Sequence, residues 1–237
     1  MFALLLAVSL AASPRPSLVD AWADKTCPLG KGGDSNVEQK QLQFERSECL
    51  AKAMNRELDR FLVPRRKKDP AAFKTWMALQ ADSNRFVKDW CQAAEDLQWI
   101  DLQHRARTSG SGVGTTHLSC LQSSSAQRGF FARALASGEL APFWSSVDAV
   151  QPAGKKSLAA IADTLKRVRT AGTSGNAEGM VPLSPKEWAD LTAQLTALAR
   201  RPGELAKGHC AALPKAPADC AAKLEAWFAS FAEVHPG

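Results

Sequence analysis

Six cysteines constrain the fold of this 237-residue chain more than any other feature. Four stand in the first half and two in the second: Cys27, Cys49, Cys91, Cys120, Cys210 and Cys220. An even number of cysteines behind a candidate export signal is typical of disulfides formed outside the cytoplasm. Six cysteines allow roughly fifteen pairings, so the count predicts three disulfides without naming the partners.

The start of the chain has the features of an export signal. Residues 2–12 form an apolar run with the length of a signal-peptide core, and Ala21-Trp22-Ala23 offers a small-residue cleavage site before Asp24. We therefore expect residues 1–23 to be a signal peptide and the mature protein to be periplasmic or secreted. Because no Lys or Arg precedes the run, a short buried or frayed amphipathic start is the alternative. Crossing a membrane takes about 20 apolar residues, so no membrane span is expected.

The charge balance argues against nucleic-acid binding. The net charge is +6 at pH 7, from 30 Lys and Arg against 24 Asp and Glu, and no basic stripe follows the chain. The one dense basic run, residues 65–68, lies between two prolines and predicts a solvated turn between helices. The alternative is a contact for an anionic envelope polymer or a lipid head group.

Helical periodicity dominates the N-terminal half. Apolar residues at three-, four- or seven-residue spacing over Val37–Phe61 predict one helix face, and this helix should end before Pro64. A second helix is predicted to start at Asp69-Pro70, with proline in its first position, and to run through Leu97. We expect these two helices to pack as a hairpin.

The rest of the chain also predicts helices. A loop over residues 108–116 and a third helix over about 118–136 complete an N-terminal domain that spans residues 24–140. We expect a linker over residues 141–154 and a helical C-terminal domain over residues 155–237, with a capping box at Ser184 and Glu187. The predicted helices of that domain are 155–171, 185–200 and 218–234. The fold class is therefore all-α: a disulfide-braced helical hairpin or bundle with a helical C-terminal extension.

The residues around each candidate catalytic or metal-binding motif do not support that function. The glycine-rich residues 110–114 resemble part of a phosphate-binding loop, but no strand is predicted before them and the third glycine is misplaced. His209, Cys210, Cys220 and His235 could be drawn as zinc ligands, yet Cys-x2-Cys spacing is missing and an oxidising compartment favours a disulfide. No paired acid and base groups can be placed in one cleft. We expect no enzyme activity, no metal and no cofactor.

The surroundings of the first four cysteines follow a recognisable order. Met54-Asn55-x-x-Leu58 follows Cys49, Gln80 and Phe86 precede Cys91, and Cys120-Leu121-x-x-x-Ser125-x-x-Arg128 follows the Gly/Thr loop. This order resembles the LprI-like lysozyme-inhibitor domain, a small exported helical module of bacteria, over about residues 27–135. The resemblance implies pairing of Cys27 with Cys49 and of Cys91 with Cys120, which leaves Cys210 for Cys220. Closing the Cys91–Cys120 loop would contribute about 3 to 4 kcal/mol on a chain-entropy model.

Polar residues beside the apolar stripes predict a structural network. Asn55, Gln80 and Arg128 are interpreted as a buried hydrogen-bond set that fixes the helix register, with ligand contact as the alternative. Trp76 and Trp90 fall on the apolar face of the second helix and should be core residues. The positions of four other tryptophans stay open, and any that are exposed would mark a partner site: Trp99, Trp144, Trp188 and Trp227.

Two function classes follow. The resemblance implies an exported protein that inhibits a lysozyme-type cell-wall glycosidase by occluding its cleft, where such enzymes carry their carboxylates. The loop over residues 105–117 is the candidate insert, because Arg105, Arg107 and His117 can meet carboxylates; a plain surface connection is the alternative. The second class is a non-inhibitory cell-envelope module that binds a protein partner or anionic wall material. A net charge of +6 disfavours fast capture of strongly basic lysozymes.

Overall fold

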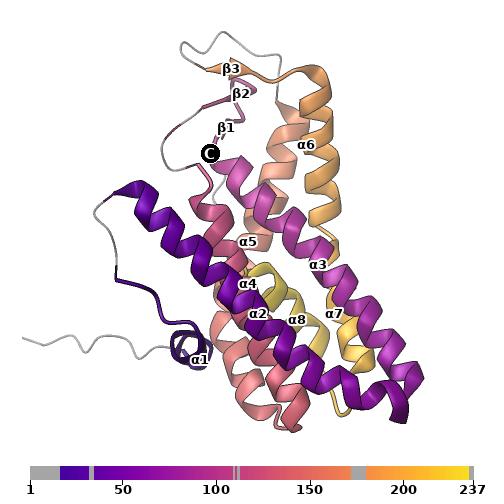
Figure 1. Cartoon of the computed structure of the whole chain (residues 1–237). Coiled ribbons are helices and arrows are strands. Elements are labelled where there is room, and N and C mark those ends of the chain that lie inside the picture. Colours follow the sequence, from indigo (N-terminus) through magenta and orange to yellow (C-terminus); the bar gives the residue numbers. More distant parts are fainter. Residues whose placement is uncertain (1–16, 32–34, 109, 111–112, 172–179, 235–237) are drawn as a thin grey trace, which may run out of the picture.

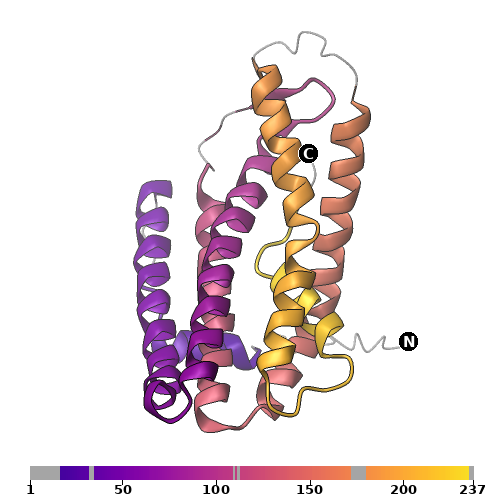
Figure 2. The same cartoon turned by 90° about the vertical axis from the view of Figure 1, so that its right-hand side faces the viewer.

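The computed structural model describes residues 17–31, 35–108, 110, 113–171 and 180–234. It confirms the all-α prediction, because long helices stand side by side in an elongated bundle and a small three-stranded sheet lies at one end (Figures 1 and 2). The helices are α1 (Leu18–Thr26), α2 (Asn36–Lys68), α3 (Pro70–Gln98), α4 (Thr115–Ser137), α5 (Ala141–Thr170), α6 (Pro185–Leu198), α7 (Arg201–Ala212) and α8 (Cys220–Ala229). The strands are β1 (Ile100–Asp101), β2 (Ala106–Arg107) and β3 (Val181–Pro182).

The helix starts predicted at Asp69 and at Ser184 are confirmed. Asp69 caps α3, since its Oδ1 accepts from the backbone N–H of Ala72 at 3.0 Å and Pro70 takes the first helical position. At α6, Ser184 Oγ accepts from the N–H of Glu187 at 3.2 Å, and Glu187 Oε2 accepts from the N–H of Ser184 at 2.8 Å. Each cap satisfies backbone donors that have no partner within the helix.

The predicted end of the first long helix is wrong. α2 continues through Pro64 to Lys68. Proline removes one backbone donor, but only the last turn lies beyond it, and there Arg65 Nη1 donates to the carbonyl of Phe61 at 2.6 Å. The basic run is therefore the last turn of α2 rather than a turn between helices, and residues 66–68 are exposed on it. Cations at this position stabilise the helix by offsetting the partial negative charge of its C-terminus.

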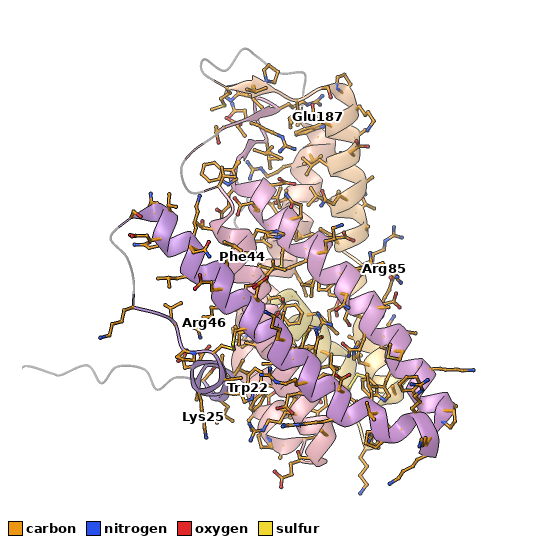
Figure 3. The ribbon with its side chains drawn as sticks, in the orientation of Figure 1. Trp22, Lys25, Phe44, Arg46, Arg85 and Glu187 are labelled. Carbon is orange, nitrogen blue, oxygen red and sulfur yellow. A yellow bond between two sulfur atoms is a disulfide. The ribbon has the colours of Figure 1, made fainter. Side chains whose placement is uncertain are left out.

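The apolar stripe of α2 is buried only in part. The predicted hairpin pairs this helix with α3, but α2 packs mainly along α4 and diverges from α3 beyond their junction (Figure 1). Val37 is 77% exposed and Phe44 is 48% exposed on the first turns, whereas the buried apolar side chains of α2 begin at Leu50 (Figure 3). The first turns thus present apolar side chains to solvent.

One hydrophobic core joins both halves of the chain. Phe131 on α4 stacks on Phe143 of α5 with ring centroids 4.3 Å apart and lies edge-on to Trp227 of α8 at 5.7 Å. Phe86 of α3 meets Phe228 of α8 at 5.9 Å. The predicted core positions Trp76 and Trp90 belong to the same cluster. Buried side chains from each of the helices α4 to α8 belong to it as well. The chain is therefore one packed unit in its described part.

The predicted linker over residues 141–154 is wrong. These residues form the first half of α5, which starts three residues after α4 ends at the left-handed Gly138. Proline and small residues suggested a connection, but Pro142 lies in the first turn, where its missing N–H costs nothing. Phe143 and Val147, one helical turn apart, are fully buried. Residues 141–154 therefore pack as part of a helix, and the packing shows no domain boundary there.

The C-terminal third holds a helix that the sequence reading missed. α6 begins at Pro185 as predicted but ends at Leu198, and α7 follows after two residues. Residues 201–217 were predicted to separate two helices, yet Pro202 suits the first turn of α7. α7 and α8 then pack against each other and are joined by the Cys210–Cys220 disulfide.

The three disulfides are those that the family resemblance implied. They join Cys27 to Cys49, Cys91 to Cys120 and Cys210 to Cys220, with Cα atoms 5.9, 5.4 and 6.0 Å apart. The first ties α1 to α2 and the second ties α3 to α4. Each bridge therefore fastens a pair of helices that follow one another in the chain.

The predicted cleavage site lies inside a folded helix. The apolar run over residues 2–12 falls outside the described residues, but Ala21, Trp22 and Ala23 belong to α1. Ser17 and Asp20 form a capping box at its start, and Trp22 is buried against Gly129, where an added Cβ would come within 2.5 Å of the indole (Figure 3). None of the described helices is long and apolar enough to cross a bilayer.

Removal of residues 1–23 is predicted to destabilise the fold. Loss of a buried tryptophan costs about 3–5 kcal/mol, so a chain that starts at Asp24 should unfold at a lower urea concentration than one that starts at Ser17. Circular dichroism during urea titration measures both midpoints. N-terminal sequencing of the exported protein should then find a mature terminus at or before Ser17; equal midpoints for the two chains would contradict a structural role for α1.

Gly154→Ala tests whether α5 is a packed helix at the predicted linker. A Cβ at Gly154 would overlap the carbonyl oxygen of Ala226 on α8, so we expect a loss of about 1–3 kcal/mol in the free energy of unfolding. Alanine otherwise favours a helix by about 1 kcal/mol over glycine. The matched control is Gly203→Ala on α7, whose Cβ meets only the flexible carboxylate of Glu225 at 3.0 Å. A stabilised Gly154→Ala would show that α5 and α8 do not pack this closely.

Candidate functional site

The loop predicted as an insert begins in the small sheet. β2 is the central strand: Ile100 of β1 pairs with Arg107, and Ala106 pairs with Pro182 of β3, both antiparallel. Strands of two residues carry too little alternation to be read from a sequence, so the sheet was not predicted. It fixes the first part of the loop against the segment that precedes α6.

A polar turn closes the β1–β2 hairpin. Asp101 Oδ1 accepts from the backbone N–H groups of Gln103 and His104 at 2.8 and 3.0 Å, and Asp101 Oδ2 lies 2.7 Å from His104 Nδ1. The His104 side chain and these N–H groups lower the pKa of Asp101 below its usual value. The turn is therefore held by the side chain that starts it.

Arg105 is part of the scaffold. Its guanidinium donates to the carbonyl of Ala171 at the end of α5 and lies 4.8 Å above the ring of Trp188 on α6. Its own carbonyl accepts from the N–H of Leu183 at 2.7 Å, and its backbone is left-handed, with φ of 49°. The side chain holds the sheet to two helices, so it is not available as a free contact.

Glu95 fixes the other end of the loop. This carboxylate on α3 is 5% exposed and lies at the start of α4, where Gly114 provides no capping side chain. Glu95 Oε1 accepts from the Gly114 N–H at 2.6 Å and from Trp99 Nε1 at 2.7 Å, and Oε2 accepts from the His117 N–H at 2.9 Å. A carboxylate from one helix thus caps the N-terminus of another.

The pKa of Glu95 reflects this capping role. Burial alone raises the pKa, but hydrogen bonds from Gly114, His117, Trp99 and Thr116 outweigh burial and lower the pKa below 4.5. The ionised carboxylate therefore stabilises the fold above about pH 4.5, and this contribution is lost as the pH falls through the lower pKa of the folded state.

The three candidate contact residues have different surroundings. Arg107 is the one whose side chain is well exposed, at 45%, and its ion pair with Asp96 is long, at 3.7 Å. His117 is half-buried, and its Nδ1 is enclosed without a hydrogen-bond partner among the described residues. Val113, at the far end of the loop, is 48% exposed. Of the predicted trio, Arg107 alone has an exposed side chain.

An apolar patch lies beside this loop, and we give that name to Val37, Phe44 and Val113. Lys40 Nζ donates to the carbonyl of Val113 at 2.9 Å and so joins the first turns of α2 to the loop. Val37 and Phe44 flank Lys40 at three- and four-residue spacing, which places them on the same face of α2. The sequence placed both on one helix face but could not show whether that face is covered, because an exposed apolar stripe and a buried one have the same periodicity.

The predicted polar network is correct in two of its three members. Arg128 is buried, and its Nη2 donates to Gln80 Oε1 at 3.0 Å and to Asn84 Oδ1 at 2.5 Å. Asn55 is exposed on α2 and makes no described contact with this set, so its prediction was wrong. Asn84 was missed, although its position four residues after Gln80 places both amides on one face of α3. The network joins α3 to α4.

Burial controls the ionisation of two residues in this region. Desolvation lowers the pKa of Arg128 to about 10, which leaves the guanidinium charged at neutral pH. His209 is buried among aromatic rings, and burial lowers its pKa to about 4. Its Nδ1 donates to the carbonyl of Leu205 at 2.9 Å as a neutral imidazole. Both residues are buried and make hydrogen bonds inside the packed helices.

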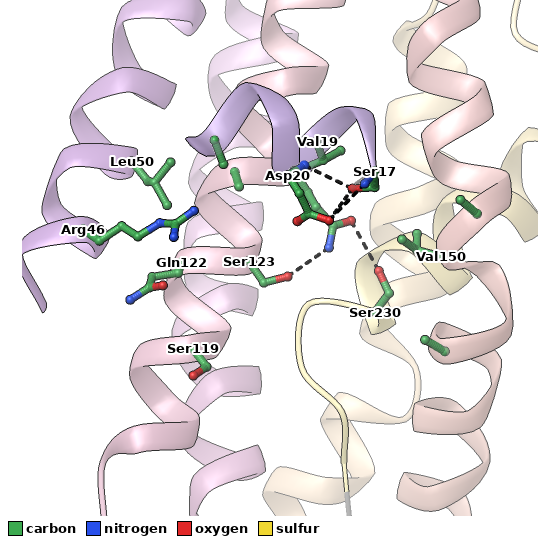
Figure 4. Close-up of a pocket in the computed structure, with 15 residues that line it drawn as sticks. Ser17, Val19, Asp20, Arg46, Leu50, Ser119, Gln122, Ser123, Val150 and Ser230 are labelled. Carbon is green, nitrogen blue, oxygen red and sulfur yellow. Dashed lines mark hydrogen bonds between the residues drawn. The ribbon is translucent and has the colours of Figure 1, made fainter. Parts of the chain in front are cut away.

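A groove beside α1 was not predicted (Figure 4). It has a volume of about 460 Å³ and lies between α1, α2, α4 and α5. Arg46 reaches it and pairs with Asp24 at 2.5 Å, and Gln127 Nε2 donates to Ser123 Oγ at 3.1 Å. The described lining holds several serines but no histidine that could activate them.

Two other kinds of site, a metal centre and a surface of exposed tryptophans, are not found among the described residues. Among the described residues, no three His, Cys, Asp or Glu side chains are grouped to hold a metal ion. Of the residues drawn as zinc ligands, Cys210 and Cys220 are joined in a disulfide, His209 is buried, and His235 lies outside the described residues. Every tryptophan is at least half-buried, so none of the four that the sequence left unplaced is an exposed surface side chain: Trp99, Trp144, Trp188 and Trp227.

Comparisons of the chain with protein-family models, with curated proteins and with solved structures found no match. The likeness to the LprI-like domain therefore rests on the order of residues in the sequence.

Glu95→Gln is predicted to lower the free energy of unfolding by about 1–3 kcal/mol at pH 7, because the amide keeps one acceptor and loses the charge. The difference from the unchanged protein should shrink as the pH falls below 4.5, since Glu95 becomes protonated first in the unfolded chain and then, at its lower pKa, in the folded protein. Urea unfolding at pH 7 and pH 3 measures this difference in the free energy of unfolding. Glu139→Gln, at an exposed position, is the control; a pH-independent loss would show that the charge of Glu95 has no part in the cap.

Proposed function

We propose that this protein is an exported, disulfide-braced binding protein that inhibits a lysozyme-type cell-wall glycosidase by occluding its cleft. The observation that carries the proposal is the apolar patch, which is exposed beside a loop held at both ends. A contiguous exposed apolar patch with polar residues around it marks an interaction site in soluble proteins.

The two described ends of the loop are held in place, which favours binding through the residues at these ends. The sheet and Arg105 fix its beginning, while Glu95 and the Cys91–Cys120 disulfide fix its end. Binding is weakened when loops and side chains must be ordered at the interface, and a surface that is already fixed avoids most of that loss.

Arg107 supplies the chemistry expected at a carboxylate-lined cleft. A guanidinium can bind a carboxylate through two parallel hydrogen bonds. Its present partner, Asp96, is 3.7 Å away and also accepts from Gln92 Nε2 at 3.1 Å, so exchanging Asp96 for a carboxylate of the target costs little. In this proposal the apolar patch contributes the contact area and Arg107 contributes the orientation.

The net charge selects among targets. A protein of charge +6 is repelled at long range by strongly basic lysozymes and attracted by acidic lytic enzymes. We therefore propose an acidic glycosidase as the preferred target. The second candidate function, a non-inhibitory envelope module that binds anionic wall material, is favoured by the exposed basic residues 66–68 at the opposite end of α2.

Phe44→Asp is predicted to weaken inhibition at least tenfold without unfolding the protein, because Phe44 is half-exposed and central to the apolar patch. Lysis of cell-wall suspensions by a panel of acidic and basic lysozyme-type enzymes, at two salt concentrations, measures inhibition. Val63→Asp is the matched control, since Val63 is 63% exposed on the same helix but far from the patch.

Arg107→Glu should weaken inhibition by a similar factor, and Arg56→Glu, exposed on α2, should not. Absence of inhibition by the unchanged protein across the panel would rule out the inhibitor proposal. Salt-sensitive retention on isolated walls without inhibition would instead favour the envelope module. Full potency of Phe44→Asp would remove the patch from the contact surface.

A further inference from the structure

A second cavity lies at the end of the bundle opposite the sheet. Here the end of α2, the start of α3, the α4–α5 connection and the segment after α7 come together (Figures 1 and 2). The cavity has a volume of about 870 Å³, within the range of about 300–1,000 Å³ that is usual for small-molecule sites. Neither the inhibitor proposal nor the loop uses it.

The lining of this cavity is mainly apolar. It includes three aromatic residues from three helices and several leucines: Phe61, Trp76, Leu135, Leu140, Trp144 and Leu213. Phe61 and Trp76 contact each other edge-on with centroids 5.1 Å apart and are almost fully buried, so this wall is part of the packed core. The cavity therefore has a fixed apolar interior.

Charged groups gather at the same place. Arg65 lies over the ring of Phe61 at 3.8 Å, and Lys215 is exposed on the segment after α7. Asp69 also lines the cavity, but its Oδ1 accepts from the Ala72 N–H as the cap of α3. Residues 66–68 continue the positive charge along the last turn of α2.

The positive charge at this end is in excess. Two cations that line the cavity, Arg65 and Lys215, stand against one lining carboxylate, Asp69, and residues 66–68 add three more cations outside the lining. None of the five makes an ion pair with a described residue, in contrast to Lys223 or Arg201 elsewhere. Lys215 also has a left-handed backbone, with φ of 60°, a conformation that lysine rarely adopts and that is often found at binding sites.

We propose that this cavity binds a single-chain anionic lipid, with the acyl chain against the aromatic wall and the head group at the cations of the mouth. An uncharged apolar ligand would leave the lining cations Arg65 and Lys215 without a role, and a flat anionic polymer would leave the cavity empty. An anionic group on an apolar chain uses both features. The proposal extends one interpretation of the basic run in the sequence, namely that it contacts a lipid head group.

Two features of the ligand can be tested separately with soluble probes. Laurate is expected to bind the full oxidised protein saturably, with one molecule per chain, and to change the fluorescence of Trp76 and Trp144. Decanoate, two carbons shorter, should bind about tenfold more weakly, because each buried methylene adds to the affinity. Monolaurin, with the same chain and a neutral head group, should also bind at least tenfold more weakly.

Variants separate the head-group contact from the chain contact. Lys215→Glu is expected to weaken laurate binding at least tenfold and to leave monolaurin binding unchanged, and Lys88→Glu on α3 is the exposed control. Ala72→Trp should block both ligands by filling the cavity, with thermal unfolding to show that the variant is folded.

Three results would overturn the proposal. The first is no saturable binding of laurate, and the second is equal binding of laurate and monolaurin. The third is adsorption to phosphatidylglycerol vesicles without binding of monomeric laurate, which would show that the cations recognise a membrane surface and not a single lipid.

Discussion

The contact of Phe131 with Phe143 and Trp227 is the interaction on which the rest of the structure depends. These rings come from α4, α5 and α8, so they join the disulfide-linked N-terminal helices to everything that follows. Close packing of large rings leaves no room for independent movement of the two halves. The end with the sheet and the end with the large cavity are therefore parts of one rigid body and not of two modules on a linker.

Much of the fold was predictable because local rules decide it. Helix starts at Asp69 and Ser184 follow from capping chemistry, which depends on neighbours a few residues apart. The errors lie where distant contacts decide: Pro142 and Gly154 indicate a connection on composition, and only the packing of Phe143 and of Ala226 shows that they lie in a helix. α7 was missed for the same reason.

The candidate site was less predictable than the fold. The Gly-rich loop and Arg107 were found from composition and charge, but the roles of Arg105 and Glu95 depend on partners far away in sequence, Ala171 and Gly114. Phe44 shows the general limit: spacing places a side chain on a helix face and cannot tell whether another element covers that face. Asn84 could have been found, since it repeats the position of Gln80 one turn later.

α3 reaches from the large cavity to the loop beside the sheet, the two sites of the proposed binding roles. Ala72 in its first turn lines the cavity, and Glu95 in its last turn holds the loop. Its 29 residues at about 1.5 Å each give a rod of about 44 Å, longer than a small globular domain is wide. A partner of that size seated at the sheet would leave the other end open to solvent. The helix therefore acts as a spacer, and occupancy of one end places no steric condition on the other.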